Sequence, residues 1–564
     1  MKSIVQIRDL TYSYRRQRNR HALAGVNLEI FQGEFVTIAG RAGAGKSTLC
    51  YALNGLIPHS FGGRMEGEVT VCGLKTRRTF VPELARHVGF VLQNAESQLV
   101  GLTVEEDVCF GLENIALPRA EVARRATAAL KTVRLENYAQ RSPWTLSGGQ
   151  KQRLAIAAAL AFQPELLVLD NPTAELDPVG KQEVMSTLGR LNSELGVTLI
   201  VVNPELEEML PYASRLVLMD AGKVTFQGKP AEVLNHTEEV EKVGLRLPDV
   251  VQVAIQLRAR KRWSGPLPIT VNDAVAGMRS LLPETREPHK APLDNKTPLQ
   301  PLIEMEAVSF SYPDGTPVLR NITLTVQPGE FITLMGPNGA GKTTLAKHMN
   351  GLLVPTQGQV RVRGIDTRRT TVASLAKTVG YVFQNPDHQL FRRSTAQELA
   401  FGPQNLGWSK GRVDDAVRTA LHRLGGEERG REDPFFMGLA ERKLIAIASV
   451  LVMEPEVLVL DEPATGADHE ATLRIMTYLA ELQRQGMTIV IVTHDVSLTA
   501  NYAQRVVALR AGEVVIDGPP SEVFSREELR SCLITPPQVT QLAQTLDPSK
   551  SICTIHELVE LLAS

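Results

Sequence analysis

Two glycine-rich segments of the chain have the residue types and spacing needed to bind a polyphosphate. Residues 40–48 read GRAGAGKST and residues 336–344 read GPNGAGKTT, so both follow the pattern GxxxxGK[ST]. In this pattern backbone N–H groups surround the phosphates at the start of a helix, the lysine reaches the β- and γ-phosphates, and the hydroxyl binds Mg²⁺. We therefore predict two ATP-binding loops that use Gly40, Gly43, Gly45, Lys46, Ser47, Thr48, Gly336, Asn338, Gly339, Gly341, Lys342, Thr343 and Thr344.

Each phosphate loop is followed, much later in the chain, by an apolar run that ends in aspartate. The run LLVLD ends at Asp170 and the run VLVLD ends at Asp461. An aspartate in this place holds Mg²⁺ directly or through water, together with Ser47 in the first copy and Thr343 in the second. The two copies are too far apart for a solenoid repeat, so the chain contains a duplicated domain.

The elements that position these residues follow from the pattern of apolar residues. Residues 4–14, 26–30, 303–312 and 322–326 read as strands, and the segments after the two phosphate loops, 47–55 and 343–351, read as helices. Short apolar strands that alternate with helices predict a parallel sheet covered on both faces. The fold class is therefore α/β.

Prolines and a second internal repeat divide the chain further. Five prolines mark a linker at 283–301, and the segments 248–254 and 536–543 resemble each other, PDVVQVA against PPQVTQLA. We expect nucleotide-binding domains at 1–234 and 302–526, each followed by a small carboxy-terminal appendage, at 235–282 and 527–564.

Composition excludes several classes of protein. The 564 residues carry a net charge of −1, so no overall field attracts nucleic acid or an anionic membrane. The five cysteines contain no CxxC pair, which argues against a disulfide framework and against zinc or iron–sulfur ligation. No secretory signal and no apolar run near 18 residues is present. We expect a cytoplasmic protein that does not span a bilayer.

A third motif lies between the phosphate loop and Asp170. Residues 146–153 read LSGGQKQR just before a predicted helix. Together with the phosphate loops, this set resembles the signature of the ABC-type ATPases, over roughly residues 1–234 and 302–526. The resemblance implies two P-loop NTPase domains that face head to tail and enclose two ATP molecules. Each ATP then contacts the phosphate loop of one domain and the signature of the other, here Ser147, Gly148, Gly149 and Gln150.

The same resemblance assigns further residues by their place in the chain. It implies a Q-loop glutamine that contacts metal or water, an aromatic that stacks on adenine, and an aspartate of the D-loop. The matching residues are, in that order, Gln93 and Gln384, Tyr14 and Tyr312, and Asp177 and Asp468.

The two copies differ at the residues that hydrolysis needs. The family orients or deprotonates water with a glutamate after the Mg²⁺ aspartate, and it binds the γ-phosphate with a histidine after the next strand. The second copy has Glu462 and His494, whereas the first has Asn171 and Pro204. Loss of a general base costs roughly 10²–10⁴ in rate. The expected catalytic residues are Glu462, His494 and Gln384.

The second copy has lost the signature instead. The segment that corresponds to LSGGQ is MGLAE, residues 437–441, so that Gly438, Leu439, Ala440 and Glu441 are degenerate. Two of these add side chains where backbone should approach phosphate, and Glu441 adds a negative charge. In a head-to-tail pair every loss falls on one composite site. We therefore expect one hydrolytic site and one site that holds ATP or hydrolyses it very slowly.

One segment indicates what the ATPase drives. QNPDHQLF, residues 384–391, resembles the energy-coupling factor importers of the cobalt and vitamin type, and QNAESQLV, residues 93–100, is a weaker copy. The paired appendages are similar to the extensions of that group's ATPases. The resemblance implies a transmembrane coupling subunit and a membrane-embedded substrate-binding subunit as partners, at the cytoplasmic face of the cell membrane. We expect the segments that dock on these partners to end at 110–111 and 401–402.

Two alternatives stay open. The first is a tandem sugar-importer ATPase, which also pairs an intact ATP site with a degenerate one but should lack QNPDHQLF. A soluble tandem ABC protein that acts on ribosomes usually has two good signatures and a long charged linker, unlike this chain. The basic runs at 15–20 and 258–262 have no interleaved aromatics, so no nucleic-acid partner is expected.

Overall fold

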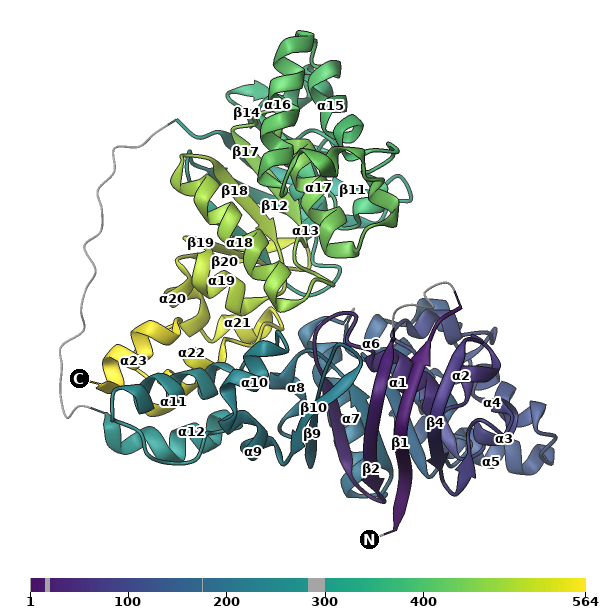
Figure 1. The fold of residues 1–564 in the computed structure, drawn as a ribbon. Coiled ribbons are helices and arrows are strands. Elements are labelled where there is room, and N and C mark those ends of the chain that lie inside the picture. The colour runs from purple at the N-terminus through teal and green to yellow at the C-terminus, as the bar shows by residue number, and fades with distance from the viewer. Residues whose placement is uncertain (1, 16–20, 175, 283–299, 564) are drawn as a thin grey trace. The chain divides into compact units, whose positions relative to one another are not determined.

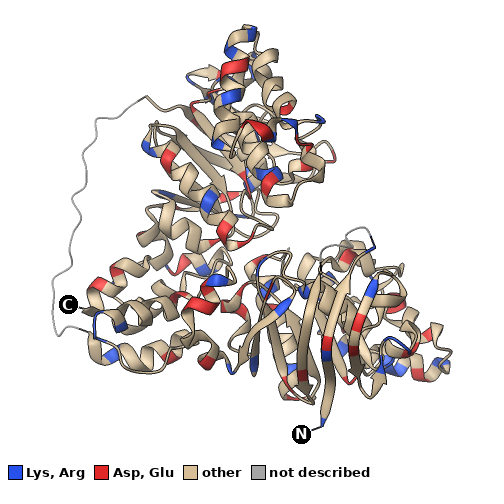
Figure 2. Ribbon diagram, viewed as in Figure 1, with Lys and Arg blue, Asp and Glu red and all other residues tan. Residues whose placement is uncertain are grey.

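The computed structural model describes residues 2–15, 21–174, 176–282 and 300–563 (Figure 1). The chain divides into two compact units, Met1–Gly277 and Met278–Ser564. Most of the expected proline-rich linker, 283–299, lies outside the described residues. Each unit contains one four-stranded and one six-stranded sheet, with strands that follow the same order along the chain. Acidic and basic residues are interspersed along the ribbon of each unit (Figure 2).

The first unit has an antiparallel sheet in the order β2-β1-β4-β5 and a larger sheet in the order β10-β9-β3-β8-β7-β6. In the larger sheet β6, β7, β8, β3 and β9 run parallel, and β10 is an antiparallel edge strand. The strands are β1 (Ser3–Ser13), β2 (Leu23–Phe31), β3 (Phe35–Ala39), β4 (Arg64–Val71), β5 (Leu74–Lys75), β6 (Val88–Val91), β7 (Leu166–Asp170), β8 (Thr198–Val202), β9 (Arg215–Asp220) and β10 (Lys223–Gly228).

The larger sheet of the first unit is buried on both faces. Leu166 and Val168 of β7 belong to the core shared with the smaller sheet and with the helix after the phosphate loop. Leu167 and Leu169 belong to a second core, formed with the helices on the other face. Successive side chains of a strand point to opposite faces, so a strand buried on both sides must be apolar throughout. This explains the continuous run LLVL.

The helices of the first unit connect these strands and follow the last one. They are α1 (Lys46–Leu53), α2 (Leu56–His59), α3 (Val81–Leu84), α4 (Val104–Asn114), α5 (Arg119–Thr132), α6 (Gly148–Leu160), α7 (Pro178–Ser193), α8 (Leu206–Met209), α9 (Pro230–Asn235), α10 (Thr237–Lys242), α11 (Asp249–Ala259) and α12 (Val271–Met278).

The second unit repeats this arrangement, with sheets β12-β11-β14-β15 and β16-β17-β18-β13-β19-β20. Its strands are β11 (Ile303–Ser311), β12 (Pro317–Val326), β13 (Phe331–Met335), β14 (Gln357–Val362), β15 (Ile365–Asp366), β16 (Val379–Val382), β17 (Val457–Asp461), β18 (Thr488–Val492), β19 (Arg505–Arg510) and β20 (Glu513–Gly518). Its helices are α13 (Lys342–Met349), α14 (Val372–Leu375), α15 (Thr395–Asn405), α16 (Lys410–Arg423), α17 (Leu439–Leu451), α18 (His469–Arg484), α19 (Val496–Tyr502), α20 (Pro520–Ser525), α21 (Glu528–Ser531), α22 (Gln538–Leu546) and α23 (Ile555–Ala563).

In the described residues of the two expected appendages, the regular elements are helices. In 235–282 these are α10, α11 and α12, and in 527–564 they are α21, α22 and α23. The repeated sequences noted above form α11 and α22, whose Val250 and Val539 are buried. Among the described residues, no helix is long and apolar enough to cross a membrane.

Two details differ from the expected parallel sheet. The larger sheets are mixed, because β10 and β20 return as antiparallel hairpins on β9 and β19. The first two strands of each unit belong to a separate antiparallel sheet. Hairpin partners follow their neighbours after short turns, whereas periodicity alone does not tell which sheet a strand joins.

Candidate functional site

The phosphate loop of the second unit lies between β13 and α13, and its glycines are required by the backbone. Gly336, Gly339 and Gly341 have φ values of 146°, 79° and 99°. A Cβ at Gly336 would lie 2.3 Å from the carbonyl oxygen of Leu509. The loop therefore tolerates no larger residue at this position. Lys342 folds back over the loop and its Nζ donates to the carbonyl oxygen of Gly336 at 2.8 Å.

The first unit builds the same loop between β3 and α1. Gly40, Gly43 and Gly45 have φ values of 154°, 77° and 94°. Lys46 Nζ donates to the carbonyl oxygens of Gly40 and Arg41, both at 2.7 Å. The two loops thus have the same geometry, with a lysine ammonium and the first N–H groups of a helix directed at one space. This donor set fits a triphosphate.

The expected metal residues meet beside each loop. In the second unit Thr343 Oγ1 donates to Asp461 Oδ1 at 3.1 Å, and the Tyr381 hydroxyl donates to Asp461 Oδ2 at 3.2 Å. Burial raises the pKa of Asp461, against the lowering effect of these two hydrogen bonds. In the first unit Ser47 hydrogen-bonds Asp170, whose pKa is also raised by burial. A hydroxyl beside a buried carboxylate supplies oxygen ligands, which are the ligands that Mg²⁺ prefers.

Glu462 and His494 are brought together in the second unit by the ends of two neighbouring strands. His494 Nδ1 lies 3.0 Å from Glu462 Oε1, and Thr465 Oγ1 donates to Glu462 Oε2 at 2.9 Å. Burial opposes the charged form of Glu462, but the hydrogen bond and charge of His494, followed by Thr465 and Lys342, lower its pKa overall. The carboxylate is thus held ionised and oriented, which suits a group that polarises water.

The corresponding turn of the first unit has a similar backbone at this position but different side chains. Asn171 has a φ of 51°, close to the 48° of Glu462, and its N–H donates to the carbonyl oxygen of Val202 at 2.8 Å. Pro204 occupies the place of His494 and has no side-chain donor. The positions are therefore structurally equivalent, and the substitutions remove a carboxylate and an imidazole.

A different polar cluster occupies this region of the first unit. Asn203 Nδ2 donates to Thr173 Oγ1 at 2.8 Å, and Thr173 Oγ1 donates to Glu208 Oε2 at 3.0 Å. Lys181 Nζ pairs with Glu208 at 2.8 Å and with Glu205 at 2.6 Å. Burial, followed by the charge of Glu205, raises the pKa of Glu208 to about 8. These residues link the turn after β8 to α7.

The signature of the first unit starts helix α6. Ser147 Oγ accepts from the N–H of Gln150 at 3.3 Å, and Gln150 Oε1 accepts from the N–H of Ser147 at 3.0 Å, which is a capping box. A Cβ at Gly149 would lie 2.9 Å from the Cα of Gly180. Gly149 therefore allows α6 and α7 to touch through their backbones, and Gly148 is the first residue of the helix.

The degenerate signature of the second unit starts α17 with a weaker cap. Gly438 has no hydroxyl, and only the return bond remains, in which Glu441 Oε2 accepts from the N–H of Gly438 at 3.3 Å. Glu441 Oε1 also accepts from Arg429 at 2.9 Å. Leu439 is 36% exposed, beside Gly466, and Ala440 follows it. The helix start thus presents side chains instead of glycine backbone.

Comparison with known proteins decides the family. The profile of the family "ABC transporter" matches residues 23–174 and 319–465. An ABC transporter ATP-binding protein of Caldanaerobacter subterraneus is 40% identical over 560 residues, which is 98% of both chains. One from Methanosarcina mazei is 39% identical over 554 residues, covering 96% of this chain and 94% of its own.

The chain belongs to the ABC transporter family. It is a tandem ABC ATPase, and the predicted fold class of two P-loop domains is confirmed. Among solved structures, the chain is 34% identical to cbiO1 from Clostridium perfringens, described as part of an ABC transporter complex. That match covers 43% of this chain and 99% of the other, with a TM-score of 0.38.

The two tyrosines expected to stack on adenine lie just after the first strand of each ABC unit. The Tyr14 and Tyr312 hydroxyls lie 3.1 and 3.3 Å from Thr48 Oγ1 and Thr344 Oγ1, one residue beyond the hydroxyls that are expected to bind Mg²⁺. Tyr312 is 37% exposed. Each ring therefore lies near its phosphate loop with part of its surface open.

The D-loop aspartates are helix caps in both ABC units. Asp177 Oδ1 accepts from the N–H of Gly180 at 2.8 Å, and Asp468 Oδ1 accepts from the N–H of Ala471 at 2.9 Å. Each begins the helix that follows the D-loop, α7 or α18.

The Q-loop glutamines are exposed in both units. Gln93 and Gln384 follow β6 and β16, whose carboxyl ends lie beside β7 and β17. The segment after Gln384 is fixed by Glu398, whose Oε2 accepts from the N–H groups of Phe391 and Arg392 at 2.9 and 2.7 Å. Phe391 is exposed there, against the ring of Phe401 at 4.7 Å. In the first unit Phe110 is also exposed.

One residue near the ABC active-site turn was missed in the sequence. Lys443 of α17 is 5% exposed, and its Nζ donates to the carbonyl oxygens of Glu462 at 2.9 Å and Thr465 at 2.6 Å. Burial lowers its pKa to about 8. Its counterpart in the first unit is Gln152. The available signal was a lysine next to Arg442 in a mostly apolar helix, which does not reveal its partners.

Proposed function

We propose that this chain is the ATP-hydrolysing motor subunit of an energy-coupling factor type importer for a vitamin or a transition-metal ion. It has one hydrolytic and one degenerate composite ATP site. The observation that carries the asymmetry is the Glu462–His494–Thr465 arrangement in the second unit, set against Asn171 and Pro204 in the first. Asn171 and Glu462 have nearly the same φ and the same backbone hydrogen bond to the next strand, so at this position the copies differ in the side chain.

In the hydrolytic site, Lys342 and the N–H groups of its loop hold the phosphates of ATP. Thr343 and Asp461 hold Mg²⁺, which neutralises charge on the phosphates. Glu462 orients or deprotonates water, and His494 holds the glutamate and reaches the γ-phosphate. By family resemblance, the signature Ser147–Gln150 completes this site, and the degenerate signature completes the other. Gln384 contacts the metal or the water.

The transport assignment rests on sequence features of both units. The segment QNPDHQLF follows the Q-loop of the second unit, and each unit ends in a small helical appendage of the kind that this group of importers carries. The partners are a transmembrane coupling subunit and a membrane-embedded substrate-binding subunit, and the chain lies peripherally at the cytoplasmic face of the membrane. ATP binding and hydrolysis then bias the partner between two states.

Purification of the tagged chain from native membranes tests the transport assignment. We expect the chain to bring two membrane proteins with it, of which the smaller binds a vitamin or metal ion. Recovery of ribosomes in their place would overturn the proposal in favour of a soluble translation factor. Recovery of a pair of sugar-permease subunits would favour the tandem sugar importer. Phe391→Ala changes an exposed residue of the segment 384–391 and leaves Gln384 in place. It should keep the ATPase rate of the isolated chain and weaken the recovery of these partners.

A further inference from the structure

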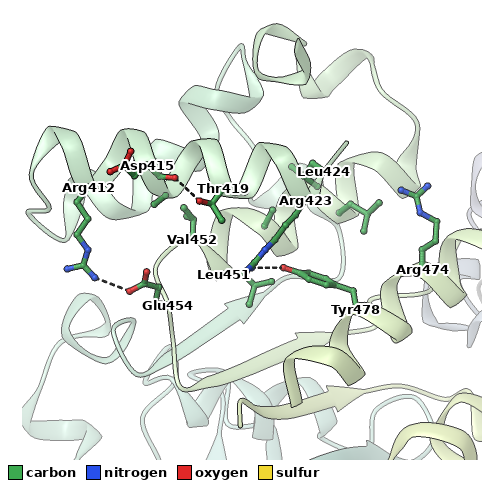
Figure 3. Close-up of a pocket in the computed structure, with 14 residues that line it drawn as sticks. Arg412, Asp415, Thr419, Arg423, Leu424, Leu451, Val452, Glu454, Arg474 and Tyr478 are labelled. Carbon is green, nitrogen blue, oxygen red and sulfur yellow. Dashed lines mark hydrogen bonds and ion pairs between the residues drawn. The ribbon is translucent and has the colours of Figure 1, made fainter. Parts of the chain in front are cut away.

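A pocket of about 460 Å³ lies in the second unit, away from the phosphate loop (Figure 3). It is enclosed by α16, the middle of α17 and α18. Its floor is apolar and includes Leu424, Leu444, Ala448, Leu451 and Val452. Its volume is in the range of small-molecule sites, which run from about 300 to 1,000 Å³ and combine apolar walls with a few polar groups.

The first unit fills the corresponding place with its own side chain. Arg153, the last residue of LSGGQKQR, is buried, with its side chain 9% exposed. Its guanidinium donates to the carbonyl oxygen of Val133 at 3.1 Å and pairs with Glu183 at 3.0 Å. These three residues tie α6 to the end of α5 and to α7. The arginine thus belongs to the packing of the first unit.

The second unit has exchanged all three residues. At the offset that relates Asp170 to Asp461, Arg153 corresponds to Leu444, Glu183 to Arg474 and Val133 to Leu424. The shorter leucine cannot reach across the space, and all three residues line the pocket. Glu183, which pairs with the buried Arg153 in the first unit, is thus replaced by Arg474 in the second. The exchange therefore replaces an internal ion pair by a cavity with a cation on its wall.

Charge is distributed unevenly around the rim. At one end Arg412 pairs with Glu454 at 2.9 Å, and Asp415 pairs with Arg418 at 3.1 Å, so the charges there are compensated. The remaining two guanidiniums lie apart in Figure 3: that of Arg423 is directed at Tyr478, and that of Arg474 points away from both residues.

The guanidinium of Arg423 lies 3.5 Å from the Tyr478 hydroxyl (Figure 3). Within the described part of the chain, neither Arg423 nor Arg474 has a carboxylate partner. The guanidinium of Arg423 is therefore an uncompensated positive charge beside the apolar floor.

We propose that this pocket binds a small organic anion with an apolar body. Its carboxylate, sulfonate or phosphate group lies at the guanidinium of Arg423, with the Tyr478 hydroxyl as a further hydrogen-bond partner. Its body packs against Leu444, Ala448 and Leu451. Guanidinium groups suit such anions because they donate paired, charge-assisted hydrogen bonds.

Two fluorescent probes that share one aromatic body test this site. 8-Anilinonaphthalene-1-sulfonate carries the anion, and N-phenyl-1-naphthylamine lacks it; both are titrated into the full chain with saturating ADP, which occupies the phosphate loops. In Arg423→Ala we expect the sulfonate to bind about tenfold more weakly, as for loss of one charge-assisted hydrogen bond. The neutral probe should bind as before. The matched control is Arg484→Ala, which removes an equal charge from α18 outside the pocket.

A second variant restores the side chains of the first unit. Leu444→Arg combined with Arg474→Glu should fill the pocket with an ion pair and abolish binding of both probes at this site, while circular dichroism and the melting temperature show that the chain is folded. Unchanged sulfonate binding in the double variant would overturn the proposal. Equal weakening by Arg423→Ala and Arg484→Ala would also overturn it, because the effect would then be one of overall surface charge.

Discussion

Replacing Glu462 with glutamine separates the chemistry of the turn from its shape. The amide has nearly the same size as the carboxylate, and it can still accept from His494 and contact Thr465, which lie 3.0 and 2.9 Å from the two oxygens. What it loses is the negative charge and the ability to take a proton. We therefore expect the fold to survive and the melting temperature to change by only a few degrees.

The rate should fall far more than the stability. Removal of a general base costs roughly 10²–10⁴ in rate. At 1.36 kcal/mol per factor of ten, this corresponds to about 3–5 kcal/mol of transition-state stabilisation. Steady-state release of phosphate from Mg-ATP measures the loss, and a fluorescent ATP analogue shows that binding persists.

The matched control is Asn171→Gln, because Asn171 has the same backbone conformation at the same place in the first unit. This variant should hydrolyse ATP within about twofold of the native rate, since no carboxylate is removed. Two results would refute the assignment. One is a Glu462→Gln enzyme within threefold of native activity, and the other is an Asn171→Gln enzyme as slow as Glu462→Gln.

Two further expectations concern stability. The first concerns Lys443→Gln, which removes the titrating group. The pKa of Lys443 is about 8 in the folded chain, against an ordinary value of 10.5. Between these pH values the unfolded native chain holds a proton that the folded chain has lost, so the unfolding free energy of the native chain rises with pH. The native chain should gain about 3 kcal/mol over the variant from pH 8 to 10.5, measured by urea denaturation, and a constant difference would contradict this. Gly149→Ala should destabilise the first unit by about 1–3 kcal/mol, because its Cβ would lie 2.9 Å from the Cα of Gly180. Gly148→Ala, whose Cβ would meet only the end of the Leu176 side chain at 3.2 Å, should cost clearly less in the same denaturation experiment.

Most of the fold could be predicted because its signals are local. The phosphate loops follow from glycine spacing, since residues such as Gly336 adopt backbone conformations that other residues avoid. The strands β7 and β17 follow from continuous apolar runs that must be buried on both faces. The placement of the first strands in a separate sheet did not follow, because pairing is a contact between distant segments.

The amino-acid sequence was sufficient to predict the candidate sites and their asymmetry, because the duplicated chain aligns with itself and each substitution between the copies is visible. Tertiary structure alone decided which groups touch. Lys443 reaches the carbonyl oxygens of Glu462 and Thr465 from another helix, and Thr465 holds the carboxylate. The pocket at Leu444 and Arg474 arises likewise, since three helices must pack before the space left by one missing arginine exists. Such contacts join residues far apart in the chain, and no local pattern records them.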